Sequence, residues 1–228
     1  MMSTSAQTIH NFSAGPCILP QSVMQQASDA VRELDGSGLS LVEISHRSKA
    51  FVDIMEEARS LVRSELNLPD HYEVLFLQGG ASLGFLTTAM NFTPEGSSMD
   101  YAVTGTWAKK ALKEAQKMGA AQAITSSEET GFDRIPALPA TSNAGAVHIT
   151  TNNTIFGTQY AGDPTIDTPM VADMSSDIFS RPVDNEKYAC IYAGAQKNMG
   201  PAGTVLYIYD TVSYTHLTLP TVVRWGGG

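Results

Sequence analysis

Two residues that could carry out chemistry each follow an apolar segment of the sequence. Lys197 comes after the run IYAGAQ and lies among small residues, where an amine that loses water has a lowered pKa and can attack a carbonyl. Asp173 ends the run MVAD, where a carboxylate needs a cation or several hydrogen-bond donors. Each has an ordinary alternative, because most lysines are solvated and many such acids cap helices or lie in loops.

Two further patterns supply groups that could bind a ligand. The turn QGGAS, Gln78–Ser82, joins small residues to the start of a predicted helix, so its backbone N–H groups could hold an anion. Trp107 follows the segment DYAVTG and could stack on a flat ring. A structural Gly-Gly turn and a core tryptophan are the alternatives. Asn153 and Thr154, after the segment AVHIT, add polar groups but are also common turn formers.

Taken together, the four patterns match the requirements of pyridoxal phosphate. Its phosphate suits the QGGAS turn, its ring suits Trp107, its pyridine nitrogen suits Asp173, and its aldehyde suits Lys197 as a Schiff base. Asp173 would keep the nitrogen protonated. Lys197, released by an incoming amine, would then move a proton between the substrate Cα and the cofactor, and the product would be a ketone.

The elements that must position these residues alternate between strand and helix patterns. Helical patterns at 82–91 and 106–119 separate short apolar segments rich in β-branched and aromatic residues, which predict strands at 72–77, 100–105, 146–150, 170–175, 188–194 and 204–209. This alternation predicts an α/β fold with a mostly parallel sheet flanked by helices in three layers. Ligands bind beyond the carboxyl ends of such strands, which is where the four patterns lie.

Two helices are expected before the sheet. One begins near Pro20 and ends before Asp35-Gly36, and the second has Ser48 as its N-cap and ends before Pro69. The segment GSGLSLVEISHR between them is predicted to be a loop. We therefore expect an N-terminal segment of residues 1–70, a cofactor-binding domain of residues 71–211, and a separate tail of residues 212–228.

The composition narrows the classes of partner. Fourteen basic and 23 acidic residues give a formal net charge of −9 over 228 residues, which argues against a nucleic-acid partner or an anionic membrane surface. The two cysteines, Cys17 and Cys190, form no CxxC pattern and suggest neither a disulfide framework nor a metal site. The N-terminus shows no secretion signal, and no apolar run is long enough to cross a membrane, so we expect a cytoplasmic protein.

Seven motifs between residues 9 and 210 resemble segments of the phosphoserine aminotransferase family, in the order in which that family has them. They are HNFSAGPCILP, VEISHRSKAF, LFLQGGASLGF, TGTWAKKA, TNNTIFGTQ, VADMSSDIFSRP and YAGAQKNMGPAG. The resemblance implies the large domain of a fold-type I, pyridoxal-phosphate-dependent aminotransferase that works as a homodimer. Its substrates would be 3-phosphohydroxypyruvate and glutamate, and its products phosphoserine and 2-oxoglutarate, in serine biosynthesis. In some bacteria the family also acts on 3-hydroxy-2-oxo-4-phosphobutanoate.

The resemblance also assigns roles to residues at matching positions. Lys197 corresponds to the Schiff-base lysine, Asp173 to the partner of the pyridine nitrogen and Trp107 to the stacking residue. The remaining cofactor contacts that it implies are Ala81, Ser82 and Gln196 for the phosphate and Thr154 for the ring oxygen. His46 and Arg47, in the motif EISHR, correspond to the site for the distal anion of the substrate, either a phosphate or a side-chain carboxylate.

The resemblance has one variable part and one limit. The turn reads GGASL where other members have GGGRG, so Ser82 and backbone N–H groups must bind the phosphate without an arginine. The tail from about Val212 matches nothing in the family, and we expect it to be artefactual or disordered. The family's small C-terminal domain, and its arginine for the substrate α-carboxylate, lie in the part that this chain lacks, so we expect little activity from it.

Two other functions are consistent with parts of the sequence. Another enzyme of the same subgroup, similar to serine-glyoxylate aminotransferase, would not explain the pair His46 and Arg47. A noncatalytic α/β module that binds a phosphate compound would leave Lys197 and Asp173 without a role.

Overall fold

The computed structural model describes residues 10–93, 96–119 and 121–215. Within them the main sheet has seven strands: β1 (Tyr72–Gln78), β2 (Met99–Val103), β3 (Ala121–Ser126), β4 (Ala146–Thr150), β7 (Met170–Asp173), β8 (Tyr188–Gly194) and β9 (Thr204–Asp210). A small second sheet pairs β5 (Asn152–Asn153) with β6 (Thr158–Gln159). The helices are α1 (Gln21–Arg32), α2 (Lys49–Leu66), α3 (Gly80–Phe92), α4 (Thr106–Gln116) and α5 (Thr211–Thr215), with short 3-10 helices at Glu128–Thr130 and Asn185–Lys187.

The main sheet is mostly parallel, as the alternation of patterns predicts. Its strand order is β1-β9-β8-β7-β4-β2-β3, and β9 runs antiparallel to both of its neighbours while the other pairs are parallel. The ends of β4, β7 and β8 share one edge, because Asp173 lies opposite Thr150 on one side and Tyr192 on the other. The end of β1 reaches the same edge, since Gln78 and Gly194 lie opposite adjacent residues of β9.

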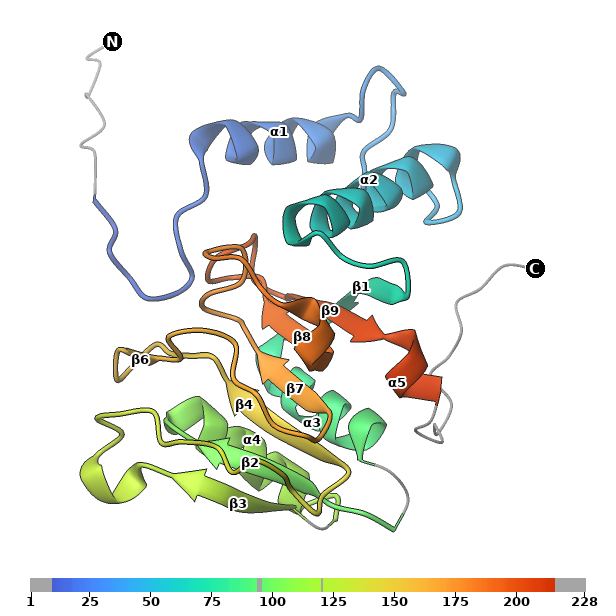
Figure 1. Cartoon of the computed structure of the whole chain (residues 1–228). Helices are drawn as coiled ribbons and strands as arrows, with labels where there is room; N and C mark the ends of the chain where they lie inside the picture. Colours follow the sequence, from blue (N-terminus) through green and yellow to red (C-terminus); the bar gives the residue numbers. More distant parts are fainter. Residues whose placement is uncertain (1–9, 94–95, 120, 216–228) are drawn as a thin grey trace.

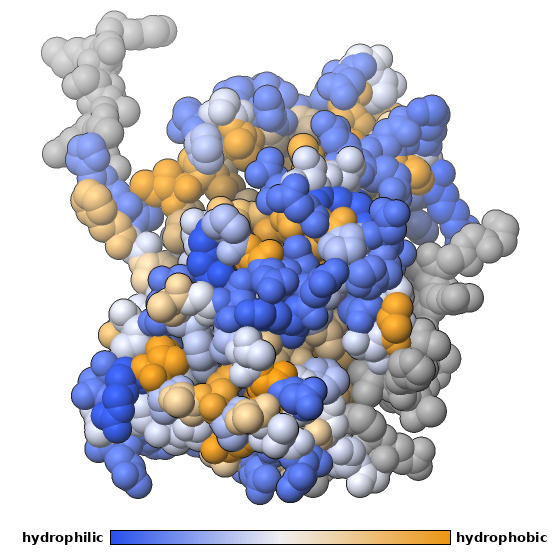
Figure 2. Space-filling model, viewed as in Figure 1, coloured by the Kyte–Doolittle hydropathy of each residue, from blue (hydrophilic) through white to orange (hydrophobic). Residues whose placement is uncertain are grey.

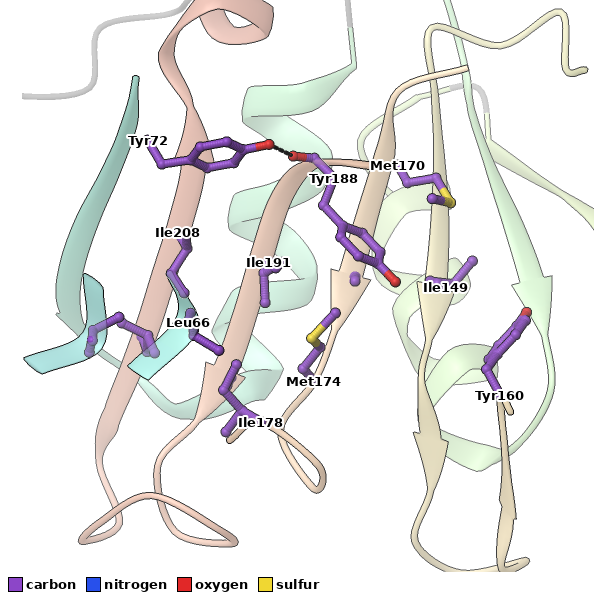
Figure 3. Packing of buried hydrophobic residues seen from close by; sticks show 14 of the residues in the cluster. Leu66, Tyr72, Ile149, Tyr160, Met170, Met174, Ile178, Tyr188, Ile191 and Ile208 are labelled. Carbon is purple, nitrogen blue, oxygen red and sulfur yellow. Dashed lines mark hydrogen bonds between the residues drawn. The ribbon is translucent and has the colours of Figure 1, made fainter. Parts of the chain in front are cut away.

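Helices and loops cover the two faces of the sheet and make three layers (Figure 1). On one face, α3 and α4 pack through Phe85, Ala111 and Ala115 onto a cluster that includes Tyr192. On the other face, Leu66 of α2 joins the second core cluster, in which Ile191 and Ile208 of neighbouring strands are buried (Figure 3). The hydroxyl of Tyr72 donates to the backbone oxygens of Asn185 and Tyr188, at 2.6 and 3.0 Å, and so satisfies buried carbonyls beside this cluster.

Three strands of the described residues were not predicted from the sequence. Strand β3 is an edge strand of mixed burial whose segment AQAITS has no continuous apolar run, so it gives only a weak strand pattern. Strands β5 and β6 have two residues each, too short for any periodicity. The predicted boundary near Val212 falls inside α5, and residues 216–228 of the predicted tail lie outside the described residues.

The predicted division at residue 70 stays a prediction, although the packing bears on it. Val62 and Leu66 of α2 are buried in the same core cluster as Tyr72 and Val74 of β1. Helix α1, which was predicted from the sequence, buries none of its residues. Among the described residues, no helix combines the length and apolar character that a membrane crossing requires.

The start of α2 follows the loop that carries His46 and Arg47. Ser48 is its N-cap, as predicted, and the Ser48 side chain accepts a hydrogen bond from the backbone N–H of Phe51. At the other end, Asn67 takes the left-handed conformation typical of helix termination.

Replacement of Ser48 by alanine is expected to lower the free energy of unfolding by about 1 kcal/mol, because one N–H of the first turn loses its partner. Urea unfolding measures the change. The matched control is Ser60→Ala at an exposed position inside the same helix, where alanine has the higher helix propensity and should cost nothing. Equal losses in the two variants would contradict the capping role.

Candidate functional site

A pocket of about 320 Å³ lies at the carboxyl edge of the sheet, between the start of α3 and the loop after β8. Six of the residues predicted from the sequence line it together: Ala81, Ser82, Trp107, Asp173, Gln196 and Lys197. They come from four separate parts of the chain, which only the folded sheet brings to one place. This convergence is the first evidence that the pocket is a functional site.

Lys197 reaches into the pocket from the loop between β8 and β9. Its Nζ donates to Thr154 Oγ1 at 2.6 Å and lies 5.3 Å from the centre of the Trp107 ring. The side chain is half-buried, and loss of solvent lowers the pKa of the amine, although the nearby charges of Asp173 and Cys17 act in the opposite direction. A lysine in this setting is a better nucleophile at neutral pH than an exposed one.

Asp173 is buried at the end of β7 with 4% of its surface exposed. Burial raises the pKa of its carboxyl, while hydrogen bonds from Ser175 and the charge of Lys197 act to lower it. The backbone N–H and hydroxyl of Ser175 both donate to Asp173 Oδ1, at 2.9 and 2.6 Å. The carboxylate is thus held by donors on one side and faces a cationic amine on the other.

The turn before α3 has the backbone expected of an anion site. Gly79 and Gly80 have φ values of 110° and 67°, in the region that favours glycine, and α3 begins at Gly80 with Gly79 as its N-cap. Across the pocket floor, a Cβ on Gly194 would lie 2.9 Å from Gln196 Oε1 and 3.2 Å from Ala81 Cβ. The absence of a side chain at Gly194 therefore lets Gln196 approach the start of α3.

Trp107 is the second residue of α4 and lines the pocket. Its indole Nε1 is buried and has no hydrogen-bond partner among the described residues. A Cβ on Gly105 would lie 2.5 Å from Asn153 Oδ1, so the start of α4 sits directly on the side chain of Asn153. Because Thr104 also donates to Asn153 Oδ1 at 3.2 Å, this one residue links the position of Trp107 to that of Thr154.

The N-terminal segment crosses the lysine loop. The backbone N–H of Cys17 donates to the carbonyl of Gln196 at 2.8 Å, and a Cβ on Gly15 would lie 3.1 Å from Lys197 Cγ. Residues 10–17 are separated from Lys197 by most of the chain, so this contact limits solvent access to the lysine only in the folded molecule.

The structure does not bring all predicted residues to the pocket. His46 and Arg47 are exposed on the loop between α1 and α2, and neither is among the residues that line the pocket, so their role stays a prediction. One residue that the sequence reasoning missed is Ser175. A serine two positions after the key aspartate in DMSSD was the available signal, because serine often bonds to nearby side chains and backbone groups.

Comparison with known proteins agrees with this geometry. The sequence model described as Aminotransferase class-V matches residues 9–218. The chain belongs to the class-V aminotransferase family. The chain is 54% identical over 203 residues to a phosphoserine aminotransferase of Flavobacterium psychrophilum, in an alignment that covers 87% of this chain and 56% of the relative. The family match includes residues 212–218, the first part of the tail that we expected to match nothing.

Solved structures give the same result. The phosphoserine aminotransferase from Bacillus circulans subsp. alkalophilus superposes with a TM-score of 0.84 at 40% identity, over 89% of this chain and 57% of that one. The pyridoxal-phosphate-bound phosphoserine aminotransferase from Trichomonas vaginalis has a TM-score of 0.82 at 32% identity, over 95% of this chain and 61% of that one. The predicted fold-type I aminotransferase fold is confirmed. The chain spans less than two thirds of the length of these relatives.

The lowered pKa of Lys197 leads to a pH-dependent prediction. Acetylation of Lys197 by acetic anhydride, followed by mass spectrometry, should reach its plateau rate at a lower pH than acetylation of the side chain in a free lysine peptide, because burial favours the neutral amine. In Asp173→Asn the profile should move to still lower pH, since the carboxylate that favours the charged amine is gone. A Lys197 profile that coincides with that of the free peptide would contradict the effect of burial.

Proposed function

We propose that this chain carries the cofactor site of a pyridoxal-phosphate-dependent transaminase that interconverts 3-phosphohydroxypyruvate and glutamate with phosphoserine and 2-oxoglutarate in serine biosynthesis. One arrangement carries the proposal: a lysine amine with a lowered pKa and a buried carboxylate face the same pocket beside an indole ring. The names of the similar proteins support the choice of substrates.

The residues present fit the cofactor in chemical type. When bound, pyridoxal phosphate supplies an aldehyde that bonds reversibly to amines and a ring that accepts the electrons of a bond broken at the neighbouring carbon. The start of α3, with Ala81 and Ser82, and the amide of Gln196 would hold the phosphate. Trp107 offers a flat surface for the ring, and its buried Nε1 is a donor that has no partner among the described residues.

Asp173 and Lys197 have different roles, which are charge balance for Asp173 and proton transfer for Lys197. Asp173 would hold a proton on the ring nitrogen, since a buried carboxylate is stabilised by a cationic partner. Lys197 Nζ, once free, would take the proton from the substrate Cα and return it to the adjacent carbon of the cofactor. In the chain without cofactor, Thr154 Oγ1 accepts a hydrogen bond from this amine and orients it.

The substrate's second anion is assigned to His46 and Arg47. A guanidinium can bind either a phosphate or the side-chain carboxylate of glutamate through two parallel hydrogen bonds, so one site could serve both substrates in turn. The four-carbon phosphate compound 3-hydroxy-2-oxo-4-phosphobutanoate presents the same anion and is included as a further substrate class. The exposed position of the loop leaves the pair accessible to a ligand.

The cellular setting and the assembly belong to the same proposal. We propose a cytoplasmic enzyme, which agrees with the two free cysteines, Cys17 and Cys190. We also propose a homodimer that uses the N-terminal helices. Apolar side chains are exposed in the part of the surface where α1 and α2 lie (Figure 2), and they include Val23, Met24 and Val31 of α1 and Ile54 and Leu61 of α2.

The cofactor assignment predicts a spectral signature. The purified chain mixed with pyridoxal phosphate should gain a visible absorption band, and borohydride should fix the cofactor to Lys197, as located by peptide mass spectrometry. Lys197→Ala should lose both. The matched control is Lys110→Ala, which removes another amine near the Trp107 ring, at 4.5 Å from its centre, and should keep both. Labelling of Lys110 in place of Lys197, or of neither, would overturn the assignment and favour a noncatalytic phosphate-binding module.

The substrate assignment predicts selectivity for a second anion. Phosphoserine should perturb the spectrum of the cofactor-loaded protein at concentrations at least tenfold lower than serine, because removal of a charged hydrogen-bond partner costs about 1.5–3 kcal/mol. Arg47→Gln should remove most of this preference and leave the response to serine unchanged. Equal responses to phosphoserine and serine in the wild-type chain would favour an enzyme similar to serine-glyoxylate aminotransferase.

A further inference from the structure

Ser175 joins the ends of two neighbouring strands beneath the pocket. It follows β7 by two residues, is 6% exposed, and its hydroxyl donates to Asp173 Oδ1 at 2.6 Å. The same hydroxyl accepts a hydrogen bond from the backbone N–H of Gly194, the last residue of β8, at 2.9 Å. Its own backbone N–H also donates to Asp173 Oδ1, at 2.9 Å.

The direction of the hydroxyl's hydrogen bond is settled by its neighbours. A backbone N–H can only donate, so the contact with Gly194 occupies a lone pair of the Ser175 oxygen. The single hydroxyl hydrogen is then available to Asp173, whose ionised carboxylate can only accept. Asp173 Oδ1 therefore receives two donors, and both are attached to backbone that the sheet holds in place.

This arrangement leaves the second carboxylate oxygen for the pocket. Asp173 lines the pocket, and its Oδ2 makes no hydrogen bond to any part of the chain that the structure describes. Because donors to a carboxylate stabilise the ionised form, Ser175 opposes the effect of burial, which favours the neutral acid. A neutral acid could not balance a cationic ring.

The contact with Gly194 adds a second constraint. Gly194 lies three residues before Lys197, and the loop between them is held by the Cys17 contact to Gln196. Ser175 thus ties the position of the acid to the strand that carries the lysine. A shift at the end of β7 or β8 would therefore displace both Asp173 and Lys197.

We propose that Ser175 is a positioning residue that keeps Asp173 ionised and directs its free oxygen at the ring nitrogen of the cofactor. The proposal rests on the proposed function for its ligand. The effect of Ser175 on Asp173 itself does not, because it belongs to the chain without cofactor.

The first measurement therefore uses the cofactor-free protein. Carbon-13 NMR of aspartate-labelled protein follows the titration of Asp173, whose signal is identified by its loss in Asp173→Asn. In Ser175→Ala the midpoint should rise by about 1–2 pH units, since one charge-assisted hydrogen bond is lost. The other titratable groups that face Asp173 are Lys197, Asp177, Tyr192 and Tyr207, and all remain in this variant.

Three variants make the comparison specific. The matched control is Ser176→Ala, because the Ser176 hydroxyl also makes two hydrogen bonds but both are to Asn152, and its Asp173 midpoint should equal that of the wild type. Ser175→Thr keeps a hydroxyl and should restore the midpoint. Ser175→Cys keeps a weak donor of similar size and should give an intermediate value, and it carries the test if the alanine variant fails to fold.

The second measurement uses protein loaded with pyridoxal phosphate that is nitrogen-15 labelled in the ring. The nitrogen signal should indicate a protonated ring in the wild type, in Ser176→Ala and in Ser175→Thr, and a less protonated ring in Ser175→Ala. Unchanged midpoints and unchanged nitrogen signals in Ser175→Ala and Ser175→Cys would overturn the proposal. A shifted Asp173 midpoint in a protein that binds no cofactor, even as wild type, would overturn the proposed function and leave the effect of Ser175 on Asp173 supported.

Discussion

The buried carboxylate of Asp173 is the group on which the rest of the site depends. An ionised acid with 4% of its surface exposed is stable only with donors or cations beside it, and the structure supplies two Ser175 donors and the amine of Lys197. Lys197 has the opposite need, because burial alone would make its charge costly. Each group thus lowers the cost of the other's charge, although burial still raises the pKa of Asp173 and lowers the pKa of Lys197.

The parallel sheet brings the end of β7, which carries Asp173, beside the end of β8, which precedes Lys197. Thr150, Asp173 and Tyr192 stand in one row across β4, β7 and β8, so residues from three separate strands lie side by side. The loops that follow these strand ends can then be short and can pack against neighbouring segments. The Asn153 contact with Gly105 and the Cys17 contact with Gln196 hold the loops with Thr154 and Lys197 against neighbouring segments.

Much of this could be predicted from the sequence, because strand ends are visible as the points where apolar runs stop. Asp173, Lys197 and the QGGAS turn were found in that way, and the capping serine of α2 was found from the helical pattern that follows it. Strand β3 was missed because an edge strand needs no apolar run. Ser175 was missed because its importance lies in a hydrogen bond to Gly194, 19 residues away, which no local pattern records. His46 and Arg47 rest on a family motif, and no local pattern or contact in the described chain assigns them a ligand.

Three uncharged side chains of the core explain why the charge of Asp173 is balanced by groups in the pocket. His148 is fully buried, accepts or donates one hydrogen bond with the Tyr192 hydroxyl at 2.8 Å, and stacks on Tyr101 with ring centres 4.9 Å apart. Burial lowers the pKa of His148 to about 3 and raises the pKa of both tyrosines, so all three groups are uncharged at neutral pH. The neutral imidazole of His148 offers Asp173 no cation. The field of Asp173 is therefore balanced from the pocket, by Lys197 or by a cationic ring, and cannot be balanced by this histidine within the core.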